Sequence, residues 1–228
     1  VGKAFSEIKK HFGDEALNKT FFHAHGTSTP QNRESESHII SSISKAFGVS
    51  SLPTTAIKSY LGHSLAAAGG DQMISALGSW KNNFIPGITS TPSLAENVYT
   101  ENVNFLLHNL EFEDGSYDFA VLNAKGFGGN NGTALIASPS KTMKMLRLKY
   151  AEKKIQKYQT KKENIDNQLL ENKNKILQGD IKSRYIFGES VIDGINNFEI
   201  ESHQITNKLN NEKFNLESTL PYKDFLKG

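Results

Sequence analysis

The chain has 228 residues, of which 37% are apolar and 22% charged, so it can bury the core of one or two globular domains. It contains no cysteine, which excludes disulfide bonds, cysteine-based zinc sites and a thiol nucleophile carried by this chain. Its longest apolar stretches, such as residues 65–68, are far too short to span a bilayer. The chain starts at Val1 without an initiator methionine or a signal-peptide pattern, so we expect a trimmed or internal start and a cytoplasmic location.

Charge and glycine content change near residues 138–140. Residues 1–140 carry 9 Lys/Arg and 12 Asp/Glu (net −3), whereas residues 141–228 carry 17 and 12 (net +5). Of the 18 glycines, 14 precede residue 140. The change predicts a glycine-rich catalytic region over 1–140 and a Lys/Asn-rich, mainly helical extension over 141–228.

Apolar periodicity predicts a mixed α/β layer structure for the first part. Apolar or β-branched runs predict strands over 21–24, 54–60, 118–123 and 133–137. Apolar residues at helical spacing predict helices over 36–47, closed by Gly48, and over 65–80. Polar and glycine-rich residues gather where the predicted strands end, which is where functional residues of layered folds concentrate.

The first candidate motif follows the first predicted strand and reads His25-Gly26-Thr27-Ser28-Thr29-Pro30. Alternate hydroxyls on an extended loop can place Thr27 and Thr29 on one face, with an imidazole nearby. On the residues alone, an ordinary structural loop histidine explains this motif equally well.

The second motif, residues 58–69, places Lys58 and His63 at a predicted strand-to-helix junction, where backbone N–H groups are free. Close helix packing explains its Ala/Gly run, but it does not explain the Lys–His pair.

The third motif, residues 123–131, is a glycine-rich turn around Phe127. Its spacing matches neither GxGxxG nor GxxxxGK[ST], which disfavours a nucleotide site. A turn that presents backbone N–H donors as an oxyanion hole fits better.

Together, the order and spacing of the three motifs resemble the C-terminal part of a β-ketoacyl-acyl-carrier-protein synthase, a type II elongating ketosynthase of the thiolase-like superfamily. The resemblance runs from about residue 21 to residue 139 and implies the C-terminal portion of a thiolase-like, layered αβαβα fold. It also implies decarboxylative Claisen condensation, in which malonyl-carrier protein loses CO₂ and the resulting carbanion attacks an acyl thioester held on a cysteine. No cofactor and no metal are implied.

The resemblance assigns roles to five residues of the first two motifs. By this resemblance, His25 and His63 match the two catalytic histidines. Two neutral imidazoles with Nε–H donors can hold the malonyl thioester oxygen as enolate charge develops. Lys58 matches a lysine that organises the site and biases histidine protonation. Thr27 and Thr29 match hydroxyls that bind the amides of the phosphopantetheine arm.

In the third motif, Lys125, Gly126, Phe127 and Gly128 match the loop that gates the acyl pocket, and the backbone N–H of residue 125 would complete the oxyanion hole. The family usually has an aromatic residue at position 125, so Lys125 is expected to alter chain-length or partner selection while the main-chain role survives. Gln72 stands where close relatives often carry a glutamate paired with the lysine.

The family places its nucleophilic cysteine upstream of the His25 motif, so an omitted N-terminal segment or a second chain is expected to supply it. Arg33 stands where an acid is common, whereas Glu36 matches a typical acid. The implied partners are acyl carrier protein and, by family habit, a second subunit in a homodimer or a heterodimer with a ketosynthase-like chain. Two alternatives stay open: a specialised polyene or polyketide ketosynthase subunit, and a non-catalytic ketosynthase-like interaction subunit, against which the retained histidines and lysine speak.

The extension carries a heptad pattern from Leu148 to Ile176, which predicts an amphipathic helix that ends near Gly179. Packing on the catalytic body and association as a coiled coil are both compatible with this pattern. Beyond it, apolar residues at 185–187, 191–192, 195, 198 and 200 can pack, and a further helix is predicted through Leu209.

Residues 141–162 form a basic block with nine Lys/Arg and one acid. A solvated helix face is the favoured interpretation, and a docking surface for an acidic carrier protein is the functional alternative. Nucleic acid binding is not expected, because the net charge of the chain is only +2 and no recognition motif accompanies the lysines.

Overall fold

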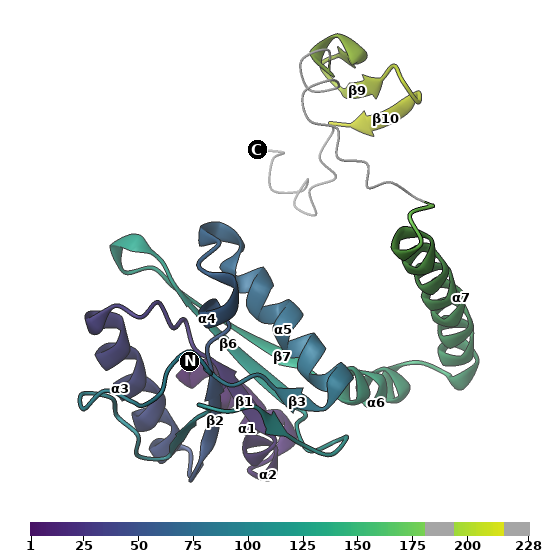
Figure 1. The fold of residues 1–228 in the computed structure, drawn as a ribbon. Helices are drawn as coiled ribbons and strands as arrows, with labels where there is room; N and C mark the ends of the chain where they lie inside the picture. Colours follow the sequence, from purple (N-terminus) through teal and green to yellow (C-terminus); the bar gives the residue numbers. More distant parts are fainter. Residues whose placement is uncertain (181–193, 217–228) are drawn as a thin grey trace, which may run out of the picture. The chain divides into compact units, whose positions relative to one another are not determined.

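The computed structural model of the protein describes residues 1–180 and 194–216 (Figure 1). Contacts between residues divide the chain into two compact units, Val1–Lys157 and Tyr158–Gly228. The first unit therefore continues beyond the change in composition near residue 140. Within the described ranges, no helix combines the length and the apolar character that a membrane span requires.

A five-stranded sheet in the order β4-β2-β1-β6-β7 organises the first unit. The strands β4 (Val103–Phe105), β2 (Leu52–Thr55), β1 (Thr20–His23) and β6 (Phe119–Lys125) run parallel, and β7 (Asn131–Ala137) pairs antiparallel with β6. A parallel sheet requires cover on both faces, and successive residues of β1 supply apolar side chains to each. Phe22 packs in the core of one face and Phe21 in the core of the other.

Helices cover both faces of this sheet (Figure 1). On the Phe22 face lie α1 (Gly2–Phe12), α2 (Glu15–Asn18) and α3 (Pro30–Ala46), which bury residues such as Phe5, Leu17 and Ile40. On the Phe21 face lies α5 (Ala68–Asn82), which buries Ala76 beside the short strands β3 (Phe84–Ile85) and β5 (Leu110–Glu111). The predicted α/β layer structure is confirmed.

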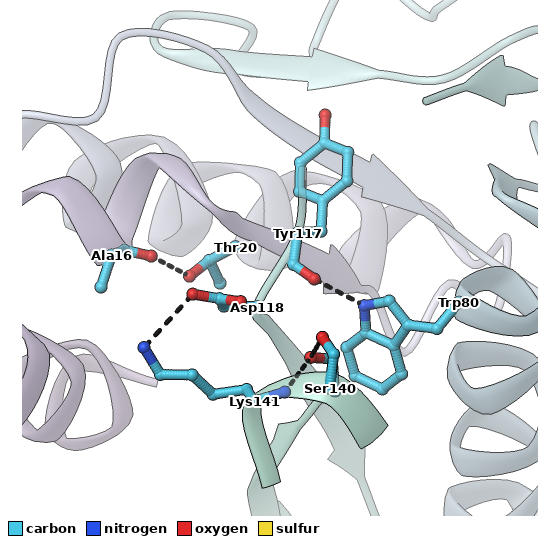
Figure 2. A network of polar contacts seen from close by, with 8 residues as sticks. Ala16, Thr20, Trp80, Tyr117, Asp118, Ser140 and Lys141 are labelled. Atoms are coloured by element: carbon cyan, nitrogen blue, oxygen red, sulfur yellow. Dashed lines mark hydrogen bonds and ion pairs between the residues drawn. The ribbon is translucent and has the colours of Figure 1, made fainter. Parts of the chain in front are cut away.

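The helix α6 (Pro139–Lys149) is attached to the sheet by its first turn. Ser138 caps it by accepting a hydrogen bond from the Lys141 amide (3.0 Å), and Pro139 occupies the first turn. The Lys141 ammonium lies 3.3 Å from Asp118, the residue before β6, and both side chains are largely buried (Figure 2). Nearby, Trp80 of α5 donates to the Tyr117 carbonyl, so both helices are tied to the segment that enters β6.

The second long helix, α7 (Glu152–Leu177), confirms the helix predicted from the heptad pattern. The chain breaks the pattern at Tyr150, which has an extended backbone, so Leu148 belongs to α6 and the later heptad positions to α7. Of the residues in α7, Ile155 is buried.

The further helix predicted through Leu209 is wrong, because a three-stranded antiparallel sheet occupies this segment of the second unit. After the short 3-10 helix η3 (Gly194–Asn197), the strands are β8 (Phe198–Ile200), β9 (Gln204–Asn207) and β10 (Glu212–Asn215). The turn before β10 explains the error, since Asn211 has a φ of +56° and Asn210 accepts from the Glu212 amide. The apolar runs at 185–187 and 191–192 lie outside the described residues.

Candidate active site

The candidate residues meet because three parallel strands end at the same edge of the sheet. His25 follows β1, Lys58 follows β2, and Lys125 is the last residue of β6. Loops at the carboxyl ends of parallel strands are the usual place for functional side chains in open α/β sheets. His25, His63, Lys58 and the 125–128 loop are therefore neighbours although up to 100 residues separate two of them in sequence.

A buried carboxylate, Glu36 of α3, holds the loop that carries His25. It accepts hydrogen bonds from the backbone amides of His25 (2.8 Å) and Gly26 (3.0 Å). The side-chain amides of Asn123 (2.7 Å) and Asn32 (3.1 Å) also donate to it. Four donors satisfy a carboxylate that would otherwise be costly to bury, and they fix the backbone on which His25 is mounted.

The resemblance did not imply that Glu36 holds the His25 loop, although the position of Glu36 in the sequence indicates that it is buried. Glu36 stands one turn before Ile40 and two turns before Ile43, on the face of α3 that packs in the core. An acid at an apolar position of a helix indicates a buried charge with specific partners.

The hydrogen bonds of His25 define its tautomer. Its Nδ1 accepts from the Lys125 backbone amide at 3.2 Å, which leaves the ring proton on Nε2. Burial, and then the positive charge of Lys58, lower the pKa of His25 below its ordinary value, while Glu36 opposes the shift. His25 is therefore a neutral Nε2–H donor near neutral pH.

His63 presents the same tautomer from a different loop. Its Nδ1 accepts from the Leu65 backbone amide at 3.0 Å, so the proton of its neutral ring lies on Nε2. The rings of His25 and His63 stand edge to face, with centroids 5.2 Å apart. The site thus holds two adjacent imidazoles that can each donate from Nε2.

Lys58 lies between these histidine loops. The predicted strand over 54–60 is wrong in its second half, because β2 ends at Thr55 and Lys58 begins the short helix α4 (Lys58–Leu61). This turn lets the Lys58 ammonium donate to the His25 carbonyl at 2.5 Å. Burial lowers the pKa of Lys58, and the carboxylates of Glu36 and Asp71 oppose the shift.

Of the two threonines, Thr27 lines a cavity of about 500 Å³. Thr27, Lys58 and His63 line this cavity together with Arg33, Ser90 and Thr91, among others. The Thr27 and Thr29 hydroxyls are 3.4 Å apart, and Thr29 is the residue before α3. The cavity gives a polar ligand access to the lysine and to one of the paired imidazoles.

The 125–128 loop leaves β6 directly beside His25. Gly126 donates to the Asn130 carbonyl at 2.7 Å, and Gly128 has a φ of +74°, a conformation that favours glycine. The Lys125 side chain donates to Ser35 on α3 at 3.2 Å, while its backbone amide is bonded to His25. An oxyanion role for this amide remains a prediction, and it requires that the amide be shared with His25 or released by it.

Two buried polar residues, Gln72 and His23, lie beneath the site. Gln72 of α5 donates to the carbonyls of Ala24 (2.9 Å) and Asn123 (3.0 Å), so its amide group bridges β1 and β6. His23 at the end of β1 is fully buried, and neither of its ring nitrogens has a hydrogen-bond partner within the described part of the chain. The resemblance places Gln72 where a glutamate is common, but neither the bridge that Gln72 makes between β1 and β6 nor the burial of His23 is encoded locally, because both depend on tertiary packing.

Comparison with known proteins identifies relatives of this arrangement. Residues 9–91 match the family of the beta-ketoacyl synthase C-terminal domain. The chain is 36% identical over 207 residues to the β-ketoacyl-[acyl-carrier-protein] synthase FabY of Pseudomonas aeruginosa, a match that covers 90% of this chain and 32% of FabY. It is 29% identical over 115 residues to 3-oxoacyl-[acyl-carrier-protein] synthase 2 of Vibrio cholerae, covering 50% of this chain and 27% of that protein.

The crystal structure of the ketosynthase FabY from P. aeruginosa is similar, with a TM-score of 0.77 and 33% identity over 98% of this chain and 35% of that chain. This chain thus spans about a third of the length of FabY. The expectation that the resemblance ends at residue 139 is wrong, since both matches to FabY extend into the basic second part. Fold, sequence and the paired imidazoles agree that the chain carries the C-terminal part of a ketosynthase of the β-ketoacyl synthase family.

Proposed function

We propose that this chain supplies the two histidines and the lysine of a condensing-enzyme active site that acts on carrier-protein thioesters. The observation that carries the proposal is the pair of imidazoles 5.2 Å apart, each accepting a backbone N–H at Nδ1. Two Nε2–H donors are suited to a carbonyl oxygen on which negative charge develops. The lysine and its hydrogen bond to the His25 carbonyl keep one of these donors in place.

In the proposed reaction, the thioester oxygen of malonyl-carrier protein accepts hydrogen bonds from His25 and His63. The bond between the malonyl α-carbon and its carboxylate breaks, CO₂ leaves, and the electron pair forms an enolate held by the two N–H donors. The enolate carbon then attacks the carbonyl of an acyl thioester on cysteine, and the cysteine thiolate leaves. Because the chain has no cysteine, another ketosynthase segment or subunit must supply it.

An exposed apolar surface beside His63 supports the need for such a segment. Its residues lie on α4, on η1 (Leu65–Ala67) and on α5, and each is 43–71% exposed. They are Tyr60, Leu61, Leu65, Met73, Ile74 and Leu77. Several large apolar residues exposed on neighbouring elements indicate an interaction site, and we assign this surface to the cysteine-bearing part of the enzyme.

The test is decarboxylation of malonyl-carrier protein by this chain assembled with a cysteine-bearing ketosynthase segment. Replacing His25 or His63 with alanine should lower the rate by about 10²–10⁴-fold, the usual effect of losing a positioned acid–base or oxyanion donor. Transfer of an acyl group to the cysteine, followed by intact-protein mass spectrometry, should persist. His11→Ala on α1 is the matched control, and equal rates for all three variants would refute the proposal.

A further inference from the structure

The turn that follows His63 has a backbone conformation that its sequence does not favour. Leu65 has a φ of +54°, in the left-handed region that a bulky residue rarely enters. Its side chain is 68% exposed, so burial of this leucine within the described structure does little to offset the strain. Strained residues persist where neighbouring contacts hold them, and they cluster at functional sites.

The turn formed by Ser64 and Leu65 determines which donor His63 meets. Ser64, with a ψ of 18°, directs the Leu65 amide back toward the ring, where it donates to Nδ1 of His63 at 3.0 Å. The left-handed φ of Leu65 then takes the chain from this amide into η1 and α5. The hydrogen bond to Nδ1 selects the Nε2–H tautomer of the ring. If the turn relaxed, Nδ1 would lose this donor and the two tautomers would both be populated.

One side-chain contact ties the turn to a rigid element. The Ser64 hydroxyl donates to Oδ2 of Asp71, which stands in the first turn of α5. This helix is fixed to the sheet by Ala76 and by the two hydrogen bonds of Gln72. The residue between His63 and Leu65 is thus anchored to a helix that is fixed to the sheet.

The same carboxylate acts on the lysine of the site. Asp71 and Glu36 are the two groups whose charge opposes the effect of burial on the pKa of Lys58. Gln72, the next residue, is neutral, and its amide is committed to the Ala24 and Asn123 carbonyls. Asp71 therefore contacts the His63 turn directly, and its charge also acts on Lys58.

We propose that Asp71, through Ser64, is a positioning residue that holds the Ser64–Leu65 turn in its strained conformation and thereby keeps His63 as an Nε2–H donor. This inference rests on the proposed role of His63 in the condensing site. A competing explanation is purely structural, since an acid in the first turn stabilises a helix by its interaction with the helix dipole.

The test is the tautomer of His63, read from ¹⁵N chemical shifts of the histidine rings in the full 228-residue chain at a pH where His63 is neutral. A His63→Gln spectrum assigns the signal. The wild-type ring should show an unprotonated Nδ1, and Asp71→Ala and Ser64→Ala should each shift it toward a mixture of tautomers. Ser64→Thr, which keeps the hydroxyl, should retain the wild-type signal, as should the control Asp166→Ala on α7.

A double variant separates positioning from helix stabilisation. Glycine adopts the left-handed conformation without the penalty of leucine, so Leu65→Gly combined with Asp71→Ala should restore much of the wild-type signal. The inference fails if Asp71→Ala lowers the melting temperature and leaves the His63 signal unchanged, or if wild-type His63 carries its proton on Nδ1. Because the readout needs no turnover, it stands apart from the decarboxylation test, which alone decides the proposed function.

Discussion

His23 shows how a single buried side chain makes this site sensitive to acid. It ends β1 two residues before His25, its ring is fully buried, and it packs against Phe21 with ring centroids 5.6 Å apart. Burial, followed by the positive charge of Lys58, lowers the pKa of His23 to about 3. The ring is neutral in the folded chain, and charging it would require the strand to open.

The first prediction is that His23 makes the free energy of unfolding fall as pH is lowered. The unfolded chain takes up a proton on His23 near its ordinary pKa of 6.5, whereas the folded chain does so only near pH 3. The folded state therefore has its full stability above pH 6.5 and loses stability as the pH falls from 6.5 toward 3. From about pH 7 to about pH 5 the loss from this group is about 2 kcal/mol. His23→Leu should remove that part of the slope in denaturant titrations, whereas a slope equal to that of the wild type would contradict it.

The second prediction concerns Gly26, which lets the His25 loop pass close to the residue after β2. Its φ is +52°, and a Cβ at this position would lie 2.5 Å from the Cβ of Ala56. Gly48 is the matched control, since its φ of +72° carries the same backbone penalty but a Cβ there meets nothing within 4 Å. Gly26→Ala should lower the free energy of unfolding by about 1–3 kcal/mol more than Gly48→Ala. Equal losses in urea titrations would mean that the loops can separate freely.

At the scale of elements, α6 is held to the sheet by a partly buried ion pair. Lys141 and Asp118 are 20% and 12% exposed, and the ammonium also lies 4.8 Å from the ring centroid of Phe12. Removing one member of such a pair leaves the other without its partner in a poorly solvated place. The attachment of α6 therefore depends on a contact between residues from the two compositional parts of the chain.

The third prediction is that Lys141→Met lowers the free energy of unfolding more than the loss of an exposed ion pair does, and that it destabilises α6 in particular. Lys141→Met should cost about 1–3 kcal/mol, and amide hydrogen exchange should accelerate along α6. Lys45→Met, which breaks the Lys45–Glu101 pair at 67% and 66% exposure, should cost about 0.5 kcal/mol or less. If both variants behave alike, Lys141 does not anchor the helix.

The elements also show which features local sequence can predict. Apolar periodicity predicts the strands β1 and β6 and the central parts of the helices α3 and α5, because each of these elements buries a continuous face. The predicted strand over 54–60 failed because β-branched residues of β2 run directly into a turn, where the amide of Tyr60 donates to the Ile57 carbonyl. The predicted helix through Leu209 failed because asparagine turns, rather than apolar spacing, determine β9 and β10.

In the candidate site, too, some residues could be predicted from local sequence and others could not. His25, Lys58 and His63 stand in short motifs, so the resemblance placed them, and the structure brings them together at one edge of the sheet. Glu36 and Gln72 act through hydrogen bonds to segments distant in sequence. An acid at an apolar position of α3 indicates that Glu36 is buried, but its partners and those of Gln72 depend on the register of β1 and β6 and on the packing of α3 and α5, which no local pattern encodes.

At the scale of the whole molecule, the basic second part of the chain belongs to the region that is similar to FabY. Residues 141–228 have a net charge of +5, and the matches to FabY extend into this part of the chain. Lys153, Lys154 and Lys157 lie on the exposed surface at the start of α7 and belong to the first compact unit. A positive patch of this kind favours encounter with an acidic partner, and the proposed function names carrier protein as that partner.

The fourth prediction is that acidic carrier protein binds this patch with a strong dependence on salt. Replacing Lys153, Lys154 and Lys157 with glutamate should weaken binding at least about tenfold at low ionic strength, which is about 1.4 kcal/mol, and the difference should shrink as salt screens the charges. The matched control reverses Lys3, Lys10 and Lys81, which are equally charged and exposed but lie elsewhere on the first unit. Binding measured by calorimetry should separate the two triple variants. If both lose affinity equally, net charge alone attracts the carrier, and the lysines of α7 serve as a solvated helix face.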